Sequence, residues 1–412
     1  MSYKERTSFV KDVLKGVLVV VVLSLTMAFL AFRGAFAGLE GKSQDFFWLG
    51  HGPTADTSDM VVLEIDDPAY AQFFKSTSPM SPAILTELVR QIALVQPAVL
   101  GIDVLTTSDA DGGGTYRRFA REKLGTKTVW ISGEDQFDPH PVNFLDWISG
   151  KDDELVVKPT QVLGYGLKDL GGPDAMLWGP AIFQTEQDLK LRRFPRAVMI
   201  SDNVHSLRGA MPKKSWAQVV AQQYCDANRR HCKHLEGDQV YLRVAGKLPP
   251  IYSLTEFFIC SGEHVIFKPG KRELLKAFVS RKIALLGGAF SNSGDFHDTT
   301  EGRVPGIFIN ARAIAAEIHG VGFHDVPEPR ALFLDMGFGF AVVLAFTALK
   351  RFGFEQHRAR TMMIGSALTA VATMAFLYFT GYMFSVPAVV IVTVIQQLWD
   401  FWREDPVKRE TA

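Results

Sequence analysis

The chain has 412 residues, 47% of them hydrophobic, and its 44 basic and 44 acidic side chains leave a formal net charge of zero. That length accommodates one large domain or two ordinary ones, together with membrane segments. No part of the chain is basic enough to indicate a nucleic-acid-binding protein. The apolar residues gather at the two ends, which is typical of membrane spans beside a water-exposed domain.

The N-terminal end holds an almost unbroken apolar run at 17–32, which follows a cluster of lysine and arginine residues. With its flanking residues this run reaches the roughly 20 residues that cross a bilayer. We therefore predict a cytoplasmic N-terminus at 1–15 and a transmembrane helix at 16–37. Ala35-Phe36-Ala37 resembles a signal-peptide cleavage site, but the apolar core is longer than a usual signal core and favours an uncleaved anchor.

Beyond the anchor, apolar stretches of strand length alternate with stretches of helical spacing. A strand at 60–65, a helix at 82–94 with Ser81 as N-cap, and a strand at 98–105 predict a parallel βαβ unit. The following region at 133–156 is loop-like. The remaining predicted elements are helices at 115–124, 215–224 and 254–259 and strands at 129–132, 162–167, 181–183, 192–200 and 239–244. The alternation predicts an α/β external domain at 38–328 with a mainly parallel sheet.

The stretch from 282 to 320 is the most informative part of this domain. Ile283-Ala284-Leu285-Leu286 has the composition of a buried strand, and Gly287-Gly288 ends it. A polar loop at 291–303 and a helix at 307–319 follow. Such an order places the polar groups of the loop at the carboxyl edge of a parallel sheet.

Acidic residues follow several of the predicted strands, so we expect them to meet at that edge. The predicted ligand-binding residues are Asp66, Asp67, Asp103, Asp295, His297 and Asp298. Carboxylates with one imidazole suit a hard or borderline divalent cation. The commoner alternative is a set of loops held by Asx turns and carboxylate–backbone hydrogen bonds.

The C-terminal end contains further apolar runs, which we predict to be transmembrane helices at 329–349, 361–382 and 383–400. The loop between the first two, 350–360, is basic. By the positive-inside rule this loop and the N-terminus are cytoplasmic, which leaves the large domain outside. The tail at 401–412 then ends inside the cell.

Two of the cysteines, Cys225 and Cys232, lie close together in the sequence. In an oxidising compartment they would form a disulfide that closes a small loop. Zinc binding with His231 or His234 is the alternative, and Cys260 is then left over as a buried thiol. No local catalytic motif is visible, so we expect neither an enzyme nor a cofactor.

The order of these segments resembles the CHASE type 2 family of extracytoplasmic sensor domains, which are found in bacterial transmembrane receptors. The matching stretches are 62–67, 100–105, 188–194, 285–288, 295–299 and 305–311. The resemblance implies residence in a bacterial inner membrane with the large domain in the periplasm. The sequence departs from the family pattern in three places. Asn310 stands where the family commonly has a histidine, and the pattern also differs at Leu189-Lys190 and directly after Thr299.

Receptors of this family usually continue into an output domain, whereas this sequence ends 13 residues after Trp399. The leading hypothesis is therefore a non-enzymatic membrane protein that senses a ligand or docks a partner and acts through other membrane proteins in the lipid bilayer. The alternative is a structural or assembly subunit of a larger membrane complex. A metal-dependent extracytoplasmic enzyme is a third, less favoured hypothesis.

Overall fold

The computed structural model describes most of residues 54–322 and only scattered residues outside that range. Within it the residues not described are 107–113, 121, 141–142, 150–153, 160–176, 186–188, 202–207, 209, 230, 234, 236–238, 242–246 and 263. Outside it the described residues are single or short groups between 14 and 45, between 324 and 340, and at 382–383. The chain divides into a central unit, 49–140 with 154–322, and a second unit, 1–48 with 141–153 and 323–412.

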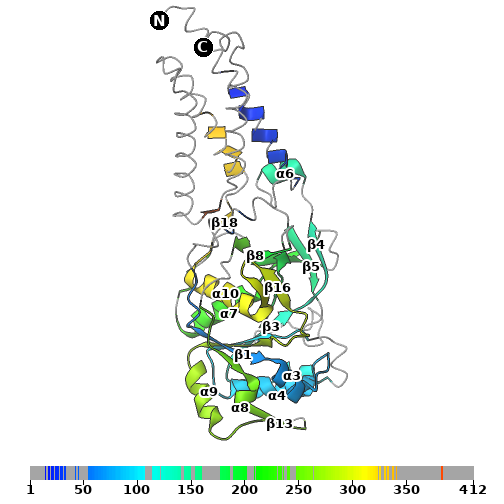
Figure 1. The fold of residues 1–412 in the computed structure, drawn as a ribbon, viewed down its shortest axis with the longest axis vertical. Helices are drawn as coiled ribbons and strands as arrows, with labels where there is room; N and C mark the ends of the chain where they lie inside the picture. Colours follow the sequence, from blue (N-terminus) through cyan, green and yellow to red (C-terminus); the bar gives the residue numbers. More distant parts are fainter. Residues whose placement is uncertain are drawn as a thin grey trace, which may run out of the picture. The chain divides into compact units, whose positions relative to one another are not determined.

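A parallel sheet of six strands forms the middle of the central unit (Figure 1). Its strands, in spatial order, are β12 (Ile251–Ser253), β1 (Met60–Ile65), β15 (Ile283–Gly288), β2 (Val99–Asp103), β3 (Lys127–Ser132) and β6 (Leu177–Pro180). The strands β1, β15 and β2 are buried along almost their whole length, as expected for a parallel sheet that is covered on both faces. The prediction of a mainly parallel α/β fold is confirmed.

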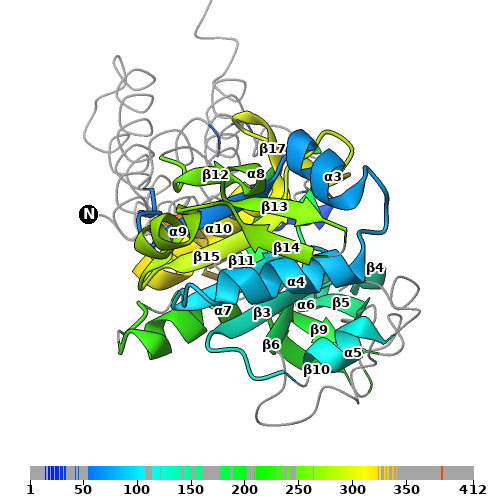
Figure 2. The same ribbon diagram turned by 90° about the horizontal axis from the view of Figure 1, so that it is seen from below.

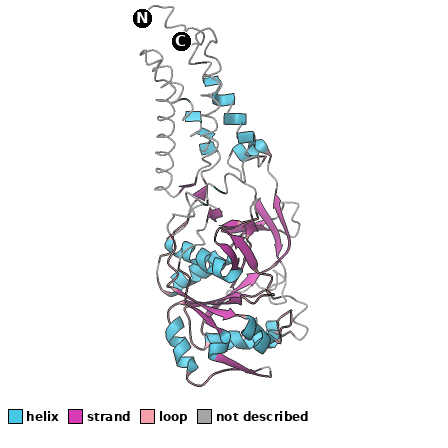
Figure 3. Cartoon of the chain, in the orientation of Figure 1, coloured by secondary structure: helices cyan, strands magenta, loops and turns pink. Residues whose placement is uncertain are grey.

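Helices cover both faces of this sheet, as Figures 1 and 3 show. One face carries α3 (Asp67–Phe74), α4 (Pro82–Ala93), α5 (Thr115–Ala120), α8 (Leu254–Phe257) and α9 (Lys271–Val279), and Figure 2 looks onto this side. The other face carries α7 (Trp216–Ala227) and α10 (Gly306–His319). Because successive strand residues point to opposite faces, Leu63 and Leu286 lie in the first core and Val62 and Leu285 in the second.

Glycine lets α7 approach the sheet closely. A Cβ at Gly101 of β2 would lie 2.9 Å from Cζ2 of Trp216, the first residue of α7. The indole Nε1 of Trp216 donates to the Val129 carbonyl of β3 at 3.0 Å. This contact fixes α7 over the middle of the second core.

Smaller sheets accompany the parallel one. One contains β11 (Gln239–Tyr241), β8 (Leu191–Pro195), β16 (Phe296–Thr299) and β17 (Gly302–Pro305), with β7 (Gln184–Thr185) paired to β8; another contains β10 (Met211–Lys214), β9 (Ala197–Ile200), β5 (Glu154–Pro159) and β4 (Glu134–His140). The strands β13 (Phe258–Ser261) and β14 (His264–Phe267) form a hairpin. In the second unit, α6 (Phe144–Ile148) and the short strands β18 (His324–Asp325) and β19 (Tyr382–Met383) are described.

Several local predictions were wrong. The predicted loop at 133–156 contains β4, α6 and the start of β5, and the polar loop at 291–303 contains β16 and the start of β17. The strand predicted at 192–200 is two strands in different sheets, and β6 ends before the predicted strand at 181–183. The strand predicted at 162–167 lies outside the described residues.

The predicted spans at 361–382 and 383–400 lie outside the described residues except for Tyr382 and Met383, and those at 16–37 and 329–349 do so in part. Among the helices that the structure describes, none combines the length and the apolar character needed to cross a bilayer.

Candidate functional site

The first member of the candidate site is Asp103, the last residue of β2. Its register partner on β15 is Gly287, so it stands at the carboxyl edge of the sheet on the side covered by α10. Asn310 of α10 donates from Nδ2 to Asp103 Oδ2 at 2.9 Å. The residue is only 8% exposed, so its carboxyl group is held almost entirely inside the protein.

The second member is Asp295, which precedes β16. Its carboxylate lies against the Cα of Gly306, where any Cβ would collide with it, and its backbone carbonyl accepts from the Gly306 N–H at 2.8 Å. Gly306 begins α10, whose N-terminal end favours a negative charge. Only a residue without a side chain leaves room for the carboxylate at this position.

His297 completes the outer part of the site. Its Nε2 lies 3.0 Å from Asp295 Oδ1, and its ring makes an edge contact with Phe183 at 5.0 Å between centroids. The side chains of His297 and Asp295 are 23% and 40% exposed. The site thus has a buried carboxyl at Asp103 and a solvent-facing carboxylate–imidazole pair.

The helix α10 joins the two parts. Gly306 contacts Asp295 and Asn310 contacts Asp103, and these two helix residues are one turn apart on the same face. The charge of Asp295 therefore acts on a neighbour that has little water around it. Burial first, and then the charge of Asp295, raise the pKa of Asp103 to about 8, against the opposing hydrogen bond from Asn310.

A third carboxyl group lies along the same edge. Glu64 of β1 is the register partner of Gly287, so Glu64 and Asp103 flank this glycine on one face, and Ile307 of α10 fills the space above it. Burial, and then the charge of Asp66, raise the pKa of Glu64. Sequence reasoning missed Glu64 because it lies inside a strand and not after one.

The other predicted residues have structural roles or lie apart. Asp66 is the N-cap of α3 and accepts from the Ala69 N–H at 2.9 Å. Asp67 accepts from the N–H and the hydroxyl of Ser291 at 2.9 and 2.7 Å, and these bonds lower its pKa. Asp298 is exposed on β16, opposite Arg303.

Of the six predicted residues, the structure brings Asp103, Asp295 and His297 together and adds Asn310. Asn310 had been noticed only as a departure from the family sequence. Within the described part of the chain, no three His, Cys, Asp or Glu side chains are close enough to hold a metal ion.

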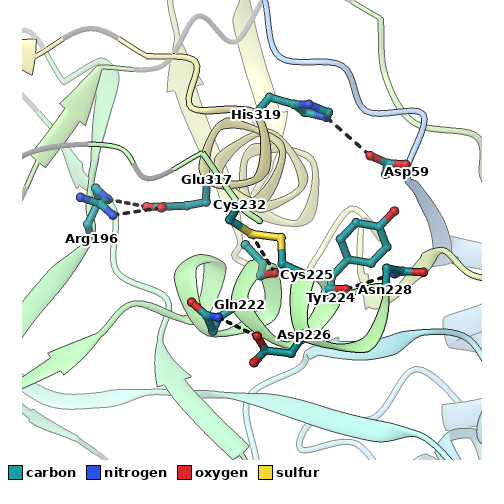
Figure 4. The surroundings of a disulfide bond; sticks show 11 residues. Asp59, Arg196, Gln222, Tyr224, Cys225, Asp226, Asn228, Cys232, Glu317 and His319 are labelled. Carbon is teal, nitrogen blue, oxygen red and sulfur yellow. Dashed lines mark hydrogen bonds and ion pairs between the residues drawn. A yellow bond between two sulfur atoms is a disulfide. The ribbon is translucent and has the colours of Figure 1, made fainter. Parts of the chain in front are cut away.

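The opposite end of α10 is anchored by charged side chains (Figure 4). Arg196 donates from Nε to Glu317 Oε1 at 2.6 Å and from Nη1 to the Leu235 carbonyl at 2.6 Å. Both partners of the ion pair are almost fully buried. His319 lies 3.6 Å from Asp59 Oδ2, so the last turn of α10 is tied to two other segments.

A disulfide lies beside this end of the helix, between Cys225 in the last turn of α7 and Cys232. The adjacent residue, Lys233, donates its backbone N–H to the Ile318 carbonyl of α10 at 3.2 Å. The disulfide therefore holds the segment after α7 against the C-terminal turn of α10. Cys260 is a free thiol of intermediate exposure and not the buried one predicted.

The comparisons with known proteins give one match. The model of the CHASE2 domain family matches residues 17–350, which is most of the chain and includes every residue of the candidate site. No curated protein matches the chain, and no solved structure does.

Proposed function

Because this chain belongs to the CHASE2 family of sensor domains, we propose that it is an integral membrane sensor whose external domain reads its signal at the site formed by Asp103, Asp295, His297 and Asn310. Sensing is the established role of the family, and CHASE2 domains are typically the extracytoplasmic domains of membrane proteins. The choice of this site, the membrane topology and the route of the signal are our proposals.

The observation that carries the proposal is the position of α10. Its first turn contacts the Asp295 carboxylate, and its second turn contacts the buried Asp103 carboxyl. The same helix ends at His319, ten residues before the predicted span at 329–349. A change of charge or occupancy at the site acts directly on α10, which then leads along the chain into the predicted membrane segment.

The same arrangement suggests how the signal leaves the protein. In the predicted topology, the spans at 329–349, 361–382 and 383–400 follow α10 in sequence. We propose that they associate with another membrane protein that produces the response. The chain would then act by contact and not by catalysis.

The test uses the full chain, carrying an affinity tag and extracted from native membranes in mild detergent. Co-purified proteins are quantified by mass spectrometry for the wild type and for Asn310→Leu, which removes the hydrogen bond to Asp103 while filling a similar volume. The matched control is Gln222→Leu, which removes an amide that bonds Asp226 on exposed α7 surface. A coupled site predicts that Asn310→Leu changes the amount of a defined membrane partner by about fivefold or more.

Two outcomes oppose the proposal. A constant partner set in all three proteins would identify a docking or assembly subunit, which is the alternative raised by the sequence. Recovery of the chain alone, or only with copies of itself, would exclude output through a partner.

A further inference from the structure

We propose that the signal read by this site is the proton itself, bound by Asp103 next to Asp295, so that the domain is a sensor of external pH. This inference rests on the proposed function, because it names the ligand of the same site. It follows from the geometry of one buried carboxyl group and its neighbours.

The carboxyl group of Asp103 has an oxygen free to carry a proton. Oδ2 accepts the Asn310 amide, and this is the only hydrogen bond that the described part of the chain makes to the side chain. A carboxylate has about four lone-pair positions to satisfy, so a buried anion with one donor is poorly stabilised. Protonation at Oδ1 removes the charge and leaves the Asn310 bond intact.

Asp295 makes the binding of that proton depend on α10. Two carboxylates that face one helix one turn apart repel each other when both are ionised. Asp295 is more exposed and lies at the helix N-terminus, where a negative charge is favoured. The buried Asp103 is therefore the group that holds the proton, and its pKa of about 8 lies within the range that a change of external pH crosses.

Among the described residues, other charged groups lie on the elements that surround the site. Across Gly287, β1 contributes Glu64, whose pKa is also raised. His297 of β16 contacts Asp295, which lies between it and the rest of the site. The elements α10 and β8 also carry the buried arginines Arg312 and Arg192, each of which has an interaction partner. The neighbouring end of β3, at Ile131 and Ser132, is uncharged.

Loss of the proton would have a mechanical consequence. Ionised Asp103 next to ionised Asp295 destabilises the arrangement in which both touch α10. Separating Asp295 from Gly306, or admitting water to Asp103, relieves the repulsion. In either case the first two turns of α10, which include Gly306 and Asn310, are held less firmly at high pH than at low pH.

The direct test measures protonation in the full chain reconstituted in lipid nanodiscs. Infrared difference spectra, recorded as pH is raised, follow the carbonyl stretch of protonated carboxyl groups. We expect a step with its midpoint near pH 8 in the wild type and its loss in Asp103→Asn. Hydrogen–deuterium exchange of 306–319, corrected for the intrinsic effect of pH, should rise across the same midpoint in the wild type but not in Asp103→Asn.

Three variants test the assignment without relying on Asp103→Asn to fold. Asp295→Asn removes the neighbouring charge and should lower the midpoint by about one unit or more, whereas Asn310→Leu removes the donor that favours the anion and should raise it. Asp298→Asn, on the exposed face of β16, should leave it unchanged.

The inference is overturned if Asp103→Asn keeps the step, if Asp295→Asn and Asn310→Leu move it in the same direction, or if exchange of 306–319 shows no transition. Those results would leave the proposed function standing as long as the partner set still responds to Asn310→Leu. If the set of co-purified proteins is the same in the wild type and in Asn310→Leu, the proposed function is refuted, whatever the titration shows.

Discussion

Replacing Asp103 by asparagine should make the protein more stable at neutral pH. This expectation is unusual, because most changes at buried polar positions destabilise a protein. Asparagine has nearly the same shape as a protonated aspartic acid and keeps a group that pairs with Asn310. It cannot ionise, so it avoids the free energy of holding an acid neutral inside the fold.

The size of the effect follows from linkage. The pKa of Asp103 is about 8 in the folded protein and 3.8 in the unfolded reference. Between these values the folded state binds one more proton than the unfolded state, so the free energy of unfolding falls by about 1.4 kcal/mol for each unit of rising pH. The interval from the unfolded value to neutral pH is about three units, which gives Asp103→Asn an advantage of at most about 4 kcal/mol there.

The assay is thermal unfolding of the full chain in mild detergent, followed by near-ultraviolet circular dichroism of buried tryptophans such as Trp130 and Trp216. For a domain of this size about 1 kcal/mol corresponds to 2–4 °C in Tm. The difference in Tm between variant and wild type should therefore widen by about 3–6 °C per unit between about pH 5 and pH 7. A difference that is constant with pH, or that narrows as pH rises, would refute the assigned titration.

Three further predictions concern the surrounding structure. Gly306→Ala should lower stability by about 1–3 kcal/mol because its Cβ meets the Asp295 carboxylate, and Gly125→Ala, whose nearest neighbour is 3.7 Å away, is the control in the same unfolding assay. Replacing Cys225 and Cys232 together by serine should cost about 2.5 kcal/mol, from the entropy of a loop with a sequence separation of 7; an unchanged Tm, with and without reductant, would contradict this. Reporter fusions should place the basic loop at 350–360 in the cytoplasm, and an extracytoplasmic signal from that loop would overturn the predicted topology.

The parallel sheet was predictable because its strands carry their own signal. Continuous apolar runs such as 60–65 and 283–286 are what burial on both faces requires. Ser81 and Pro82 likewise placed the start of α4 correctly. The strand order was not predictable from these runs, because β15 comes from a distant part of the chain and inserts between β1 and β2.

The sequence predicted the type and the location of the candidate site, but not which residues form it. Acidic residues that follow strands do gather at one edge, yet the two at the start of α3 already have structural partners. Asp66 caps α3, and Asp67 accepts hydrogen bonds from Ser291, which lies far away in the sequence. Which carboxyl group is buried depends on what covers it. The covering helix is decided by tertiary packing, so the sequence around Asp103 carries no sign of it.

Asn310 shows why the decisive residue escaped sequence reasoning. It lies in an apolar, alanine-rich helix that is buried from Gly306 to Ile318, where a single amide reads as an ordinary packed side chain. Its importance arises because β2 ends opposite it and because Gly306, one turn earlier, holds Asp295. The same helix is fixed at its C-terminal end by the Arg196–Glu317 ion pair. A change of charge at the site therefore acts on the N-terminal end of α10, which is the end that can move. That end is where we expect an external signal to act first.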